Sequence, residues 1–123
     1  MKVRAALSAR FHLARRASEH GIQPVLGTLT PIRASRYDFF LADGNEDIRQ
    51  AVNDAIMTQR DWPTADFSAA LADPDDPSRI AAAFDSGDGV HPADAGACAL
   101  ADAIDLTAFT QDRPHPRLHG TRI

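Results

Sequence analysis

The chain of 123 residues is 44% hydrophobic and 24% charged, and its formal net charge is -4. That length suits one domain, and the acidic balance argues against a nucleic-acid partner. Cys98 is the single cysteine, which excludes an internal disulfide, and no apolar run approaches the roughly 20 residues of a membrane span. Arginines interrupt the N-terminal segment where a signal peptide would be apolar, so we expect a cytoplasmic location for the sequence as written.

The N-terminal segment predicts a helix followed by a buried strand. Apolar residues recur at helical spacing over 3–20, and Gly21 is well placed to end that helix. The run 22–29 is apolar without alternation, which is typical of a strand covered on both faces, and Thr30-Pro31 ends it.

A loop over 32–43 carries Tyr37, Phe39 and Phe40. Exposed aromatic side chains in such a loop would suit an acyl-substrate groove, whereas buried ones would only support the loop. We expect the second arrangement, with the rings packed beneath the loop.

The next segment predicts a second helix. Asp43 and Glu46 resemble a capping box, so the helix is expected to begin there and to run to about Gln59. The periodicity assigns one set of residues to the core and another to solvent: Ile48, Val52, Ala55 and Ile56 face inward, and Arg49, Asn53 and Asp54 face outward.

The second half predicts a short strand over 65–67, one helical turn within 78–84 and a helix over about 94–106. A strand, a helix and a strand in that order indicate a right-handed unit with parallel strands. Cys98 falls in the apolar pattern of the last helix, where we expect a small core residue. We assign 1–109 to one domain and 110–123, which lacks apolar periodicity, to a disordered tail.

Asp88 and His91 lie three residues apart in a glycine-flanked loop, directly before Pro92 and the last helix. A carboxylate at that spacing can accept the imidazole Nδ1–H bond and leave Nε2 to take a proton from a nucleophile. The alternative is a loop carboxylate that caps its own backbone beside an exposed histidine. A second Asp-x-x-His copy, Asp112 with His115, has no structural element after it, so we choose the first copy as the candidate site.

The segment 88–96, Asp-Gly-Val-His-Pro-Ala-Asp-Ala-Gly, resembles the last conserved block of the SGNH (GDSL-type) hydrolases, although Ala93 stands where that family often has Asn. The segment 21–31 is similar to the family strand that ends in Thr-Pro, and 66–71 to its next strand and exit loop. The resemblance implies an α/β fold. It would be part of a flavodoxin-like three-layer α/β/α sandwich with parallel strands.

The resemblance also implies an activity, that of an esterase, lipase or other acylhydrolase acting on small-molecule or glycan acyl esters. In that reading Asp88 orients the imidazole, and His91 acts as general base and then as general acid. It implies no cofactor. We expect no metal either, because Asp85, Asp88, His91 and Asp94 match neither an EF-hand loop nor a zinc pattern.

The family's G-D-S serine and most of its oxyanion hole have no counterpart here, and none of the six serines lies in a G-D-S or G-x-S-x-G motif. We therefore expect the C-terminal portion of such a domain, doubtful in activity on its own, whose incomplete sheet edge favours self-association. Full-length relatives are often secreted. The alternatives are a non-catalytic binding or regulatory remnant and a functionless fragment of a truncated reading frame.

Overall fold

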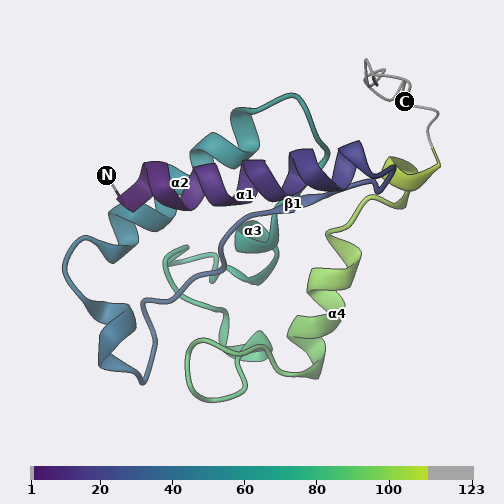
Figure 1. Ribbon diagram of the computed structural model, residues 1–123. Helices are drawn as coiled ribbons and strands as arrows, with labels where there is room; N and C mark the ends of the chain where they lie inside the picture. The colour runs from purple at the N-terminus through teal and green to yellow at the C-terminus, as the bar shows by residue number, and fades with distance from the viewer. Residues whose placement is uncertain (1, 111–123) are drawn as a thin grey trace, which may run out of the picture.

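The computed structural model describes residues 2–110, which combine α-helices, short 3₁₀-helices and two parallel strands (Figure 1). Of the predicted tail over 110–123, all residues except Thr110 lie outside the described range. The elements follow in chain order: α1 (Lys2–Glu19), β1 (Leu26–Gly27), η1 (Asp38–Leu41), α2 (Asn45–Thr58), β2 (Thr64–Ala65), α3 (Phe67–Leu71), η2 (Ala82–Phe84), α4 (Asp94–Asp102) and η3 (Leu106–Phe109).

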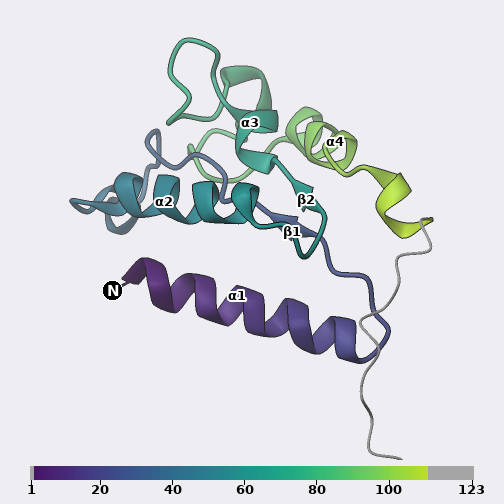
Figure 2. The ribbon, with the colours of Figure 1, turned by 90° about the horizontal axis from the view of Figure 1, so that it is seen from above.

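The two strands lie between helices. Figure 2 shows α1 and α2 on one side of the strand pair, and α3 and α4 on the other. The strands pair in parallel, with Leu26 opposite Thr64 and Gly27 opposite Ala65. The order strand, helix, strand and the parallel pairing were both predicted, and both are confirmed. The α/β class therefore holds.

The strands are much shorter than the apolar run 22–29 predicted. Pro24 has no N–H to donate to a neighbouring strand. At the other end, Leu29 gives its N–H to the Asn53 side chain at 2.7 Å, and its carbonyl accepts from the Asn53 amide at 2.9 Å. Among residues 2–110, β1 pairs with β2 alone, so its second edge has no strand beside it.

The main core forms where α1 packs on α2 and β1. Ala14, Leu26, Val52 and Ile56 are its buried centre, which confirms the inward placement predicted for Val52 and Ile56. Partly buried apolar residues surround that centre: Val3, Ala6, Leu7, Phe11, Leu29, Ile48 and Trp62.

The start of α2 differs from the expected capping box. Gly44 is the N-cap residue, with φ 84°, and no side chain caps the helix, so the assignment of Asp43 was wrong. Glu46 instead pairs with Arg49, with an Nη2–Oε1 distance of 2.5 Å. Arg49 was expected to face solvent but is 6% exposed, because its guanidinium also donates to the Leu29 carbonyl and to the Ser68 hydroxyl.

The expected strand over 65–67 ends early, because Asp66 caps α3 by accepting the Ala69 N–H at 3.1 Å. The last helix, α4, is also shorter than expected, and Gly96 is its only buried residue. A Cβ at Gly96 would lie 2.6 Å from the Phe84 carbonyl oxygen, so glycine permits the close approach of α4 to η2. Cys98 is exposed, which corrects its assignment to the core.

Candidate functional site

The loop over 85–92 is closed at its base and linked internally by hydrogen bonds to the Asp85 side chain. Its two ends meet through a bridge between Asp85 and Pro92 and through the bond from the Ser86 N–H to the His91 carbonyl, at 3.0 Å. Within the loop, Asp85 Oδ1 accepts the N–H groups of Gly87 and Gly89, each at 2.9 Å. The loop is therefore a fixed frame for the residues between its ends.

The Asp88 carboxylate accepts several hydrogen bonds from within this loop. Its Oδ1 accepts the backbone N–H groups of Val90 at 2.9 Å and His91 at 2.8 Å. Its Oδ2 contacts His91 Nδ1 at 2.5 Å. These contacts, above all the His91 N–H, then the His91 ring and the Val90 N–H, hold the pKa of the Asp88 carboxyl far below its ordinary value of 3.8.

His91 presents the other side of its ring outward. Its side chain is 67% exposed, whereas that of Asp88 is 16% exposed. When the neutral imidazole carries its proton on Nδ1, it donates to Asp88 Oδ2, and Nε2 is then an acceptor. Within the described part of the chain, Nε2 has no hydrogen-bond partner, which leaves it accessible to an incoming proton donor.

A segment distant in sequence braces this loop through contacts that the sequence pattern did not predict. The Arg36 N–H donates to the Asp88 carbonyl at 2.8 Å, and Arg36 Nη2 to the Gly87 carbonyl at 3.2 Å. The Tyr37 hydroxyl donates to Asp88 Oδ2 at 3.2 Å. Since 51 residues separate Tyr37 from Asp88, no local pattern could have indicated the contact.

Gly89 makes the close approach of these two segments possible. It has a φ of 75°, and a Cβ built there would overlap the Ala34 carbonyl oxygen. Only glycine fits both requirements. Gly89 is thus required both by its backbone angle and by its packing against Ala34.

The loop before α2 does not bury its aromatic side chains as expected. Phe39 is 68% exposed and Tyr37 is 39% exposed, while Phe40 is half-buried. The expected packing beneath the loop is therefore wrong for Tyr37 and Phe39. Tyr37 brings this exposed aromatic surface to the Asp88 carboxylate.

Within residues 2–110, none of the six serine hydroxyls has the His91 ring as a hydrogen-bond partner. Ser86 is nearest in sequence, and its hydroxyl lies 3.5 Å from Asp88 Oδ1, on the carboxylate side of the pair. Ser68 accepts from Arg49, and Ser78 donates to Asp76. The Asn53 side chain, which was expected to face outward, bonds both backbone groups of Leu29.

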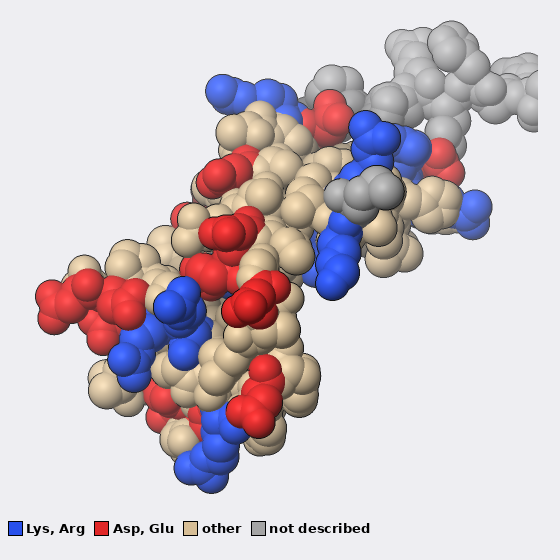
Figure 3. Space-filling view, turned by 90° about the vertical axis from the view of Figure 1, so that its left-hand side faces the viewer, with Lys and Arg blue, Asp and Glu red and all other residues tan. Residues whose placement is uncertain are grey.

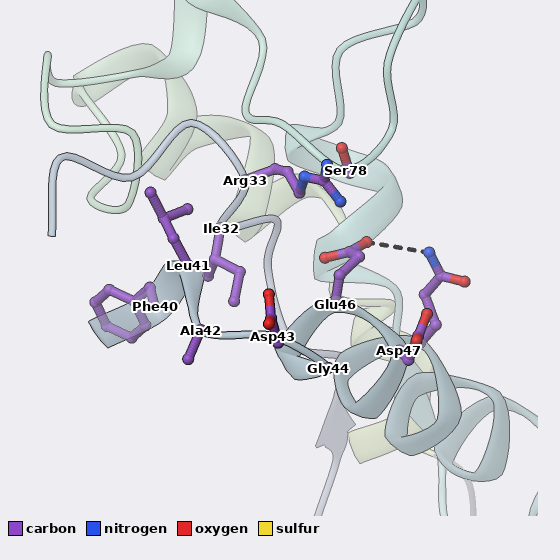
Figure 4. A pocket seen from close by; sticks show the side chains of 11 residues that line it. Ile32, Arg33, Phe40, Leu41, Ala42, Asp43, Gly44, Glu46, Asp47 and Ser78 are labelled. Atoms are coloured by element: carbon purple, nitrogen blue, oxygen red, sulfur yellow. Dashed lines mark hydrogen bonds between the residues drawn. The ribbon is translucent and has the colours of Figure 1, made fainter. Parts of the chain in front are cut away.

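A cavity of about 580 Å³ opens between η1, the start of α2 and Arg33 (Figure 4). Phe40 and Leu41 lie on one side of it in this view, and Glu46 and Asp47 on the other. A second cavity, of about 550 Å³, shares Glu46, Gln50 and Ser78 with the first. Neither cavity is lined by Asp88 or His91, so the Asp–His pair lies on open surface.

Acidic and basic side chains are interspersed on the face of the molecule that Figure 3 shows. Within residues 2–110, no group of three or more His, Cys, Asp and Glu side chains is arranged to hold a metal ion. None of the helices in that range is both long enough and apolar enough to cross a membrane.

No protein-family model matches this chain, and no curated protein matches it in sequence. A functional interpretation therefore depends on the geometry of the loop over 85–92.

Proposed function

We propose that this chain is the acid–base portion of a carboxylic-ester hydrolase of the SGNH (GDSL) type. Asp88 holds His91 in the tautomer with its proton on Nδ1. Nε2 takes the proton of a serine hydroxyl and then returns it to the leaving alcohol. The observation that carries the proposal is the 2.5 Å contact between His91 Nδ1 and Asp88 Oδ2, made on a braced loop with the rest of the ring exposed.

The proposal extends to the fold. The strand pair with helices on both sides is interpreted as part of a flavodoxin-like three-layer α/β/α sandwich. Parallel strands occur almost only in sheets that are covered on both faces, which supports this assignment. The unpaired edge of β1 is where further strands would add, and the serine and the oxyanion donors would come from that added segment.

The first test uses the isolated chain. Its hydrolysis of p-nitrophenyl acetate should equal that of buffer with free imidazole, because no serine hydroxyl among the described residues bonds the His91 ring. A fluorophosphonate probe should label no serine. Stoichiometric labelling of one serine would contradict the proposal that the nucleophile comes from an added segment.

The second test joins the chain to the segment that its coding frame specifies upstream, where that segment contains G-D-S. The joined protein should hydrolyse acyl esters of small molecules or glycans, and His91→Ala should abolish most of the turnover. Ser78→Ala serves as the control, since Ser78 bonds Asp76 away from the site. An inactive joined protein, or one whose turnover is unchanged by His91→Ala, would favour a non-catalytic binding remnant.

A further inference from the structure

We propose that Tyr37, Phe39 and Phe40 form a platform that binds a flat apolar ring of the ester substrate. This inference rests on the proposed function, because it places the ring beside the Asp88–His91 pair. Three large hydrophobic residues of the single segment 37–41 are exposed: Tyr37 (39%), Phe39 (68%) and Leu41 (45%). Exposed apolar surface concentrated in this way marks binding sites more often than chance exposure does.

The platform is rigidly supported although it is exposed. The rings of Phe39 and Phe40 have centroids 4.2 Å apart, and those of Tyr37 and Phe39 are 6.0 Å apart. The Asn45 side chain donates to the carbonyls of Phe39 at 3.1 Å and Phe40 at 3.2 Å. The Ser35 hydroxyl accepts the Tyr37 N–H at 2.9 Å. A ligand therefore meets a preformed surface and need not order the loop to bind.

The platform is continuous with the candidate site. The Tyr37 hydroxyl and His91 Nδ1 both contact the same oxygen, Asp88 Oδ2. A group that lies on the Tyr37 and Phe39 rings is thus within one side chain of the imidazole. Because the platform adjoins the Asp88–His91 pair, we assign its occupant to the molecule whose ester reaches Nε2.

The chemistry of the platform selects the kind of group. Its polar atoms already have partners, since the Tyr37 hydroxyl bonds Asp88 and the Asn45 amide bonds two carbonyls. Sugar hydroxyls would lose water there without gaining equivalent bonds. A flexible alkyl chain would lose rotational freedom on an open surface that contacts it from one side only. A rigid aromatic ring avoids both losses and can stack in an offset or edge-on geometry.

The test measures binding to the chain, both alone and joined to its upstream segment, because binding needs no nucleophile. Acetanilide is the probe, because it joins an aryl ring to an acyl group through an amide that resists hydrolysis. Its addition should shift the NMR signals of the His91 imidazole and of the Phe39 ring. Phe39→Ser should weaken binding about tenfold or more, and Phe39→Leu by less. Leu106→Ser, which replaces a side chain 72% exposed on η3, should leave binding unchanged.

Three outcomes would overturn the platform: no shift at His91 or Phe39, equal binding by Phe39→Ser with its fold intact, or equal weakening by Leu106→Ser. Tighter binding of hexanamide or methyl β-xyloside than of acetanilide would overturn the aromatic class. The readout is separate from hydrolysis, so an inactive joined protein would refute the proposed function without changing this result.

Discussion

At the scale of single residues, the hydrogen bonds that define the site are made to the Asp88 carboxylate. The donors on it favour its charged form, and its pKa is lowered in the folded chain. The stabilisation from ionised Asp88 is therefore complete above the pKa of the unfolded chain, and it is lost only when the pH falls through the lower folded value. Asp88 stays ionised as an acceptor for His91 across the neutral and mildly acidic range.

The two Asp-x-x-His copies give a residue-scale prediction for the joined protein. His91→Ala should lower ester turnover by about 10²–10⁴-fold, because a positioned general base is removed. His115→Ala, at a residue outside the described part of the chain, should leave turnover near the unsubstituted value. Steady-state rates with p-nitrophenyl acetate provide the measurement, and equal losses would show that the wrong loop was chosen.

Gly89 gives a second prediction, with Gly21 as a matched control. The two have nearly the same φ, 75° and 73°, but a Cβ at Gly21 would meet nothing within 4 Å, whereas one at Gly89 would overlap Ala34. Gly21→Ala should lower the free energy of unfolding by about 1–2 kcal/mol, the backbone cost alone. Gly89→Ala should cost more and should also break the bond between Arg36 and Asp88.

Denaturant unfolding measures the cost, and the NMR signals of Arg36 and His91 report the displaced loop. If Gly89→Ala matches Gly21→Ala in stability and leaves those signals in place, the contact with Ala34 does not hold the loop.

At the scale of elements, Arg49 ties α2 to the ends of both strand segments. Its guanidinium bonds Leu29 after β1 and Ser68 in α3, and Glu46 balances its charge. Asn53, one turn later, bonds both backbone groups of Leu29. These hydrogen bonds from Arg49 and Asn53 take the place of the longer strand that the sequence predicted after Gly27.

Glu46→Gln should therefore destabilise the chain at pH 7, because it leaves the buried Arg49 without a counter-charge. We expect a loss of about 2–3 kcal/mol, less than for a fully buried pair, since Arg49 keeps its other acceptors. The Arg49 contact lowers the Glu46 pKa from its ordinary value of 4.5. The stabilisation should thus be complete above that value and disappear as the pH falls through the lower folded pKa.

Urea unfolding at pH 7 and at pH 3 measures this difference. Glu19→Gln on the exposed surface of α1 is the control and should have little effect at either pH. If Glu46→Gln lowers the free energy of unfolding as much at pH 3 as at pH 7, the shape of the Glu46 side chain, and not its charge, stabilises the contact with Arg49.

At the scale of the whole molecule, the covering of the strand pair is incomplete. One edge of β1 has no neighbour within residues 2–110, and α4 buries only Gly96. Ile22, Leu13 and Leu106 are each more than half exposed. At roughly 25 cal/mol per Å² of apolar surface, a few hundred Å² left uncovered forfeits several kcal/mol, which is comparable to the net stability of a small domain.

The isolated chain should therefore form a dimer or larger assembly, or unfold without a sharp transition. Size-exclusion chromatography over a range of concentrations, together with thermal melting, tests this. A monomer at all concentrations with a sharp cooperative transition would show that the chain completes its own core, and the partial-domain interpretation would fail.

Local sequence patterns determined the buried helix faces, the parallel strand pairing and the Asp88–His91 pair. Apolar residues three and four apart specify the buried faces of α1 and α2, since one helix face can be recognised from spacing alone. The order strand, helix, strand implied parallel pairing, because the intervening helix returns the chain to the same end. The short spacing of Asp88 and His91, with glycines beside them, brings carboxylate and imidazole together within one loop.

Only the tertiary structure decided the rest. Arg49 lies on the polar side of its own helix, yet it is buried, because the chain after β1 supplies the acceptors that permit it. The strand after Gly27 stops because an Asn53 side chain takes the backbone bonds that a neighbouring strand would need. Tyr37 reaches Asp88 across 51 residues. These contacts join segments distant in the sequence, so no spacing within a single segment could encode them.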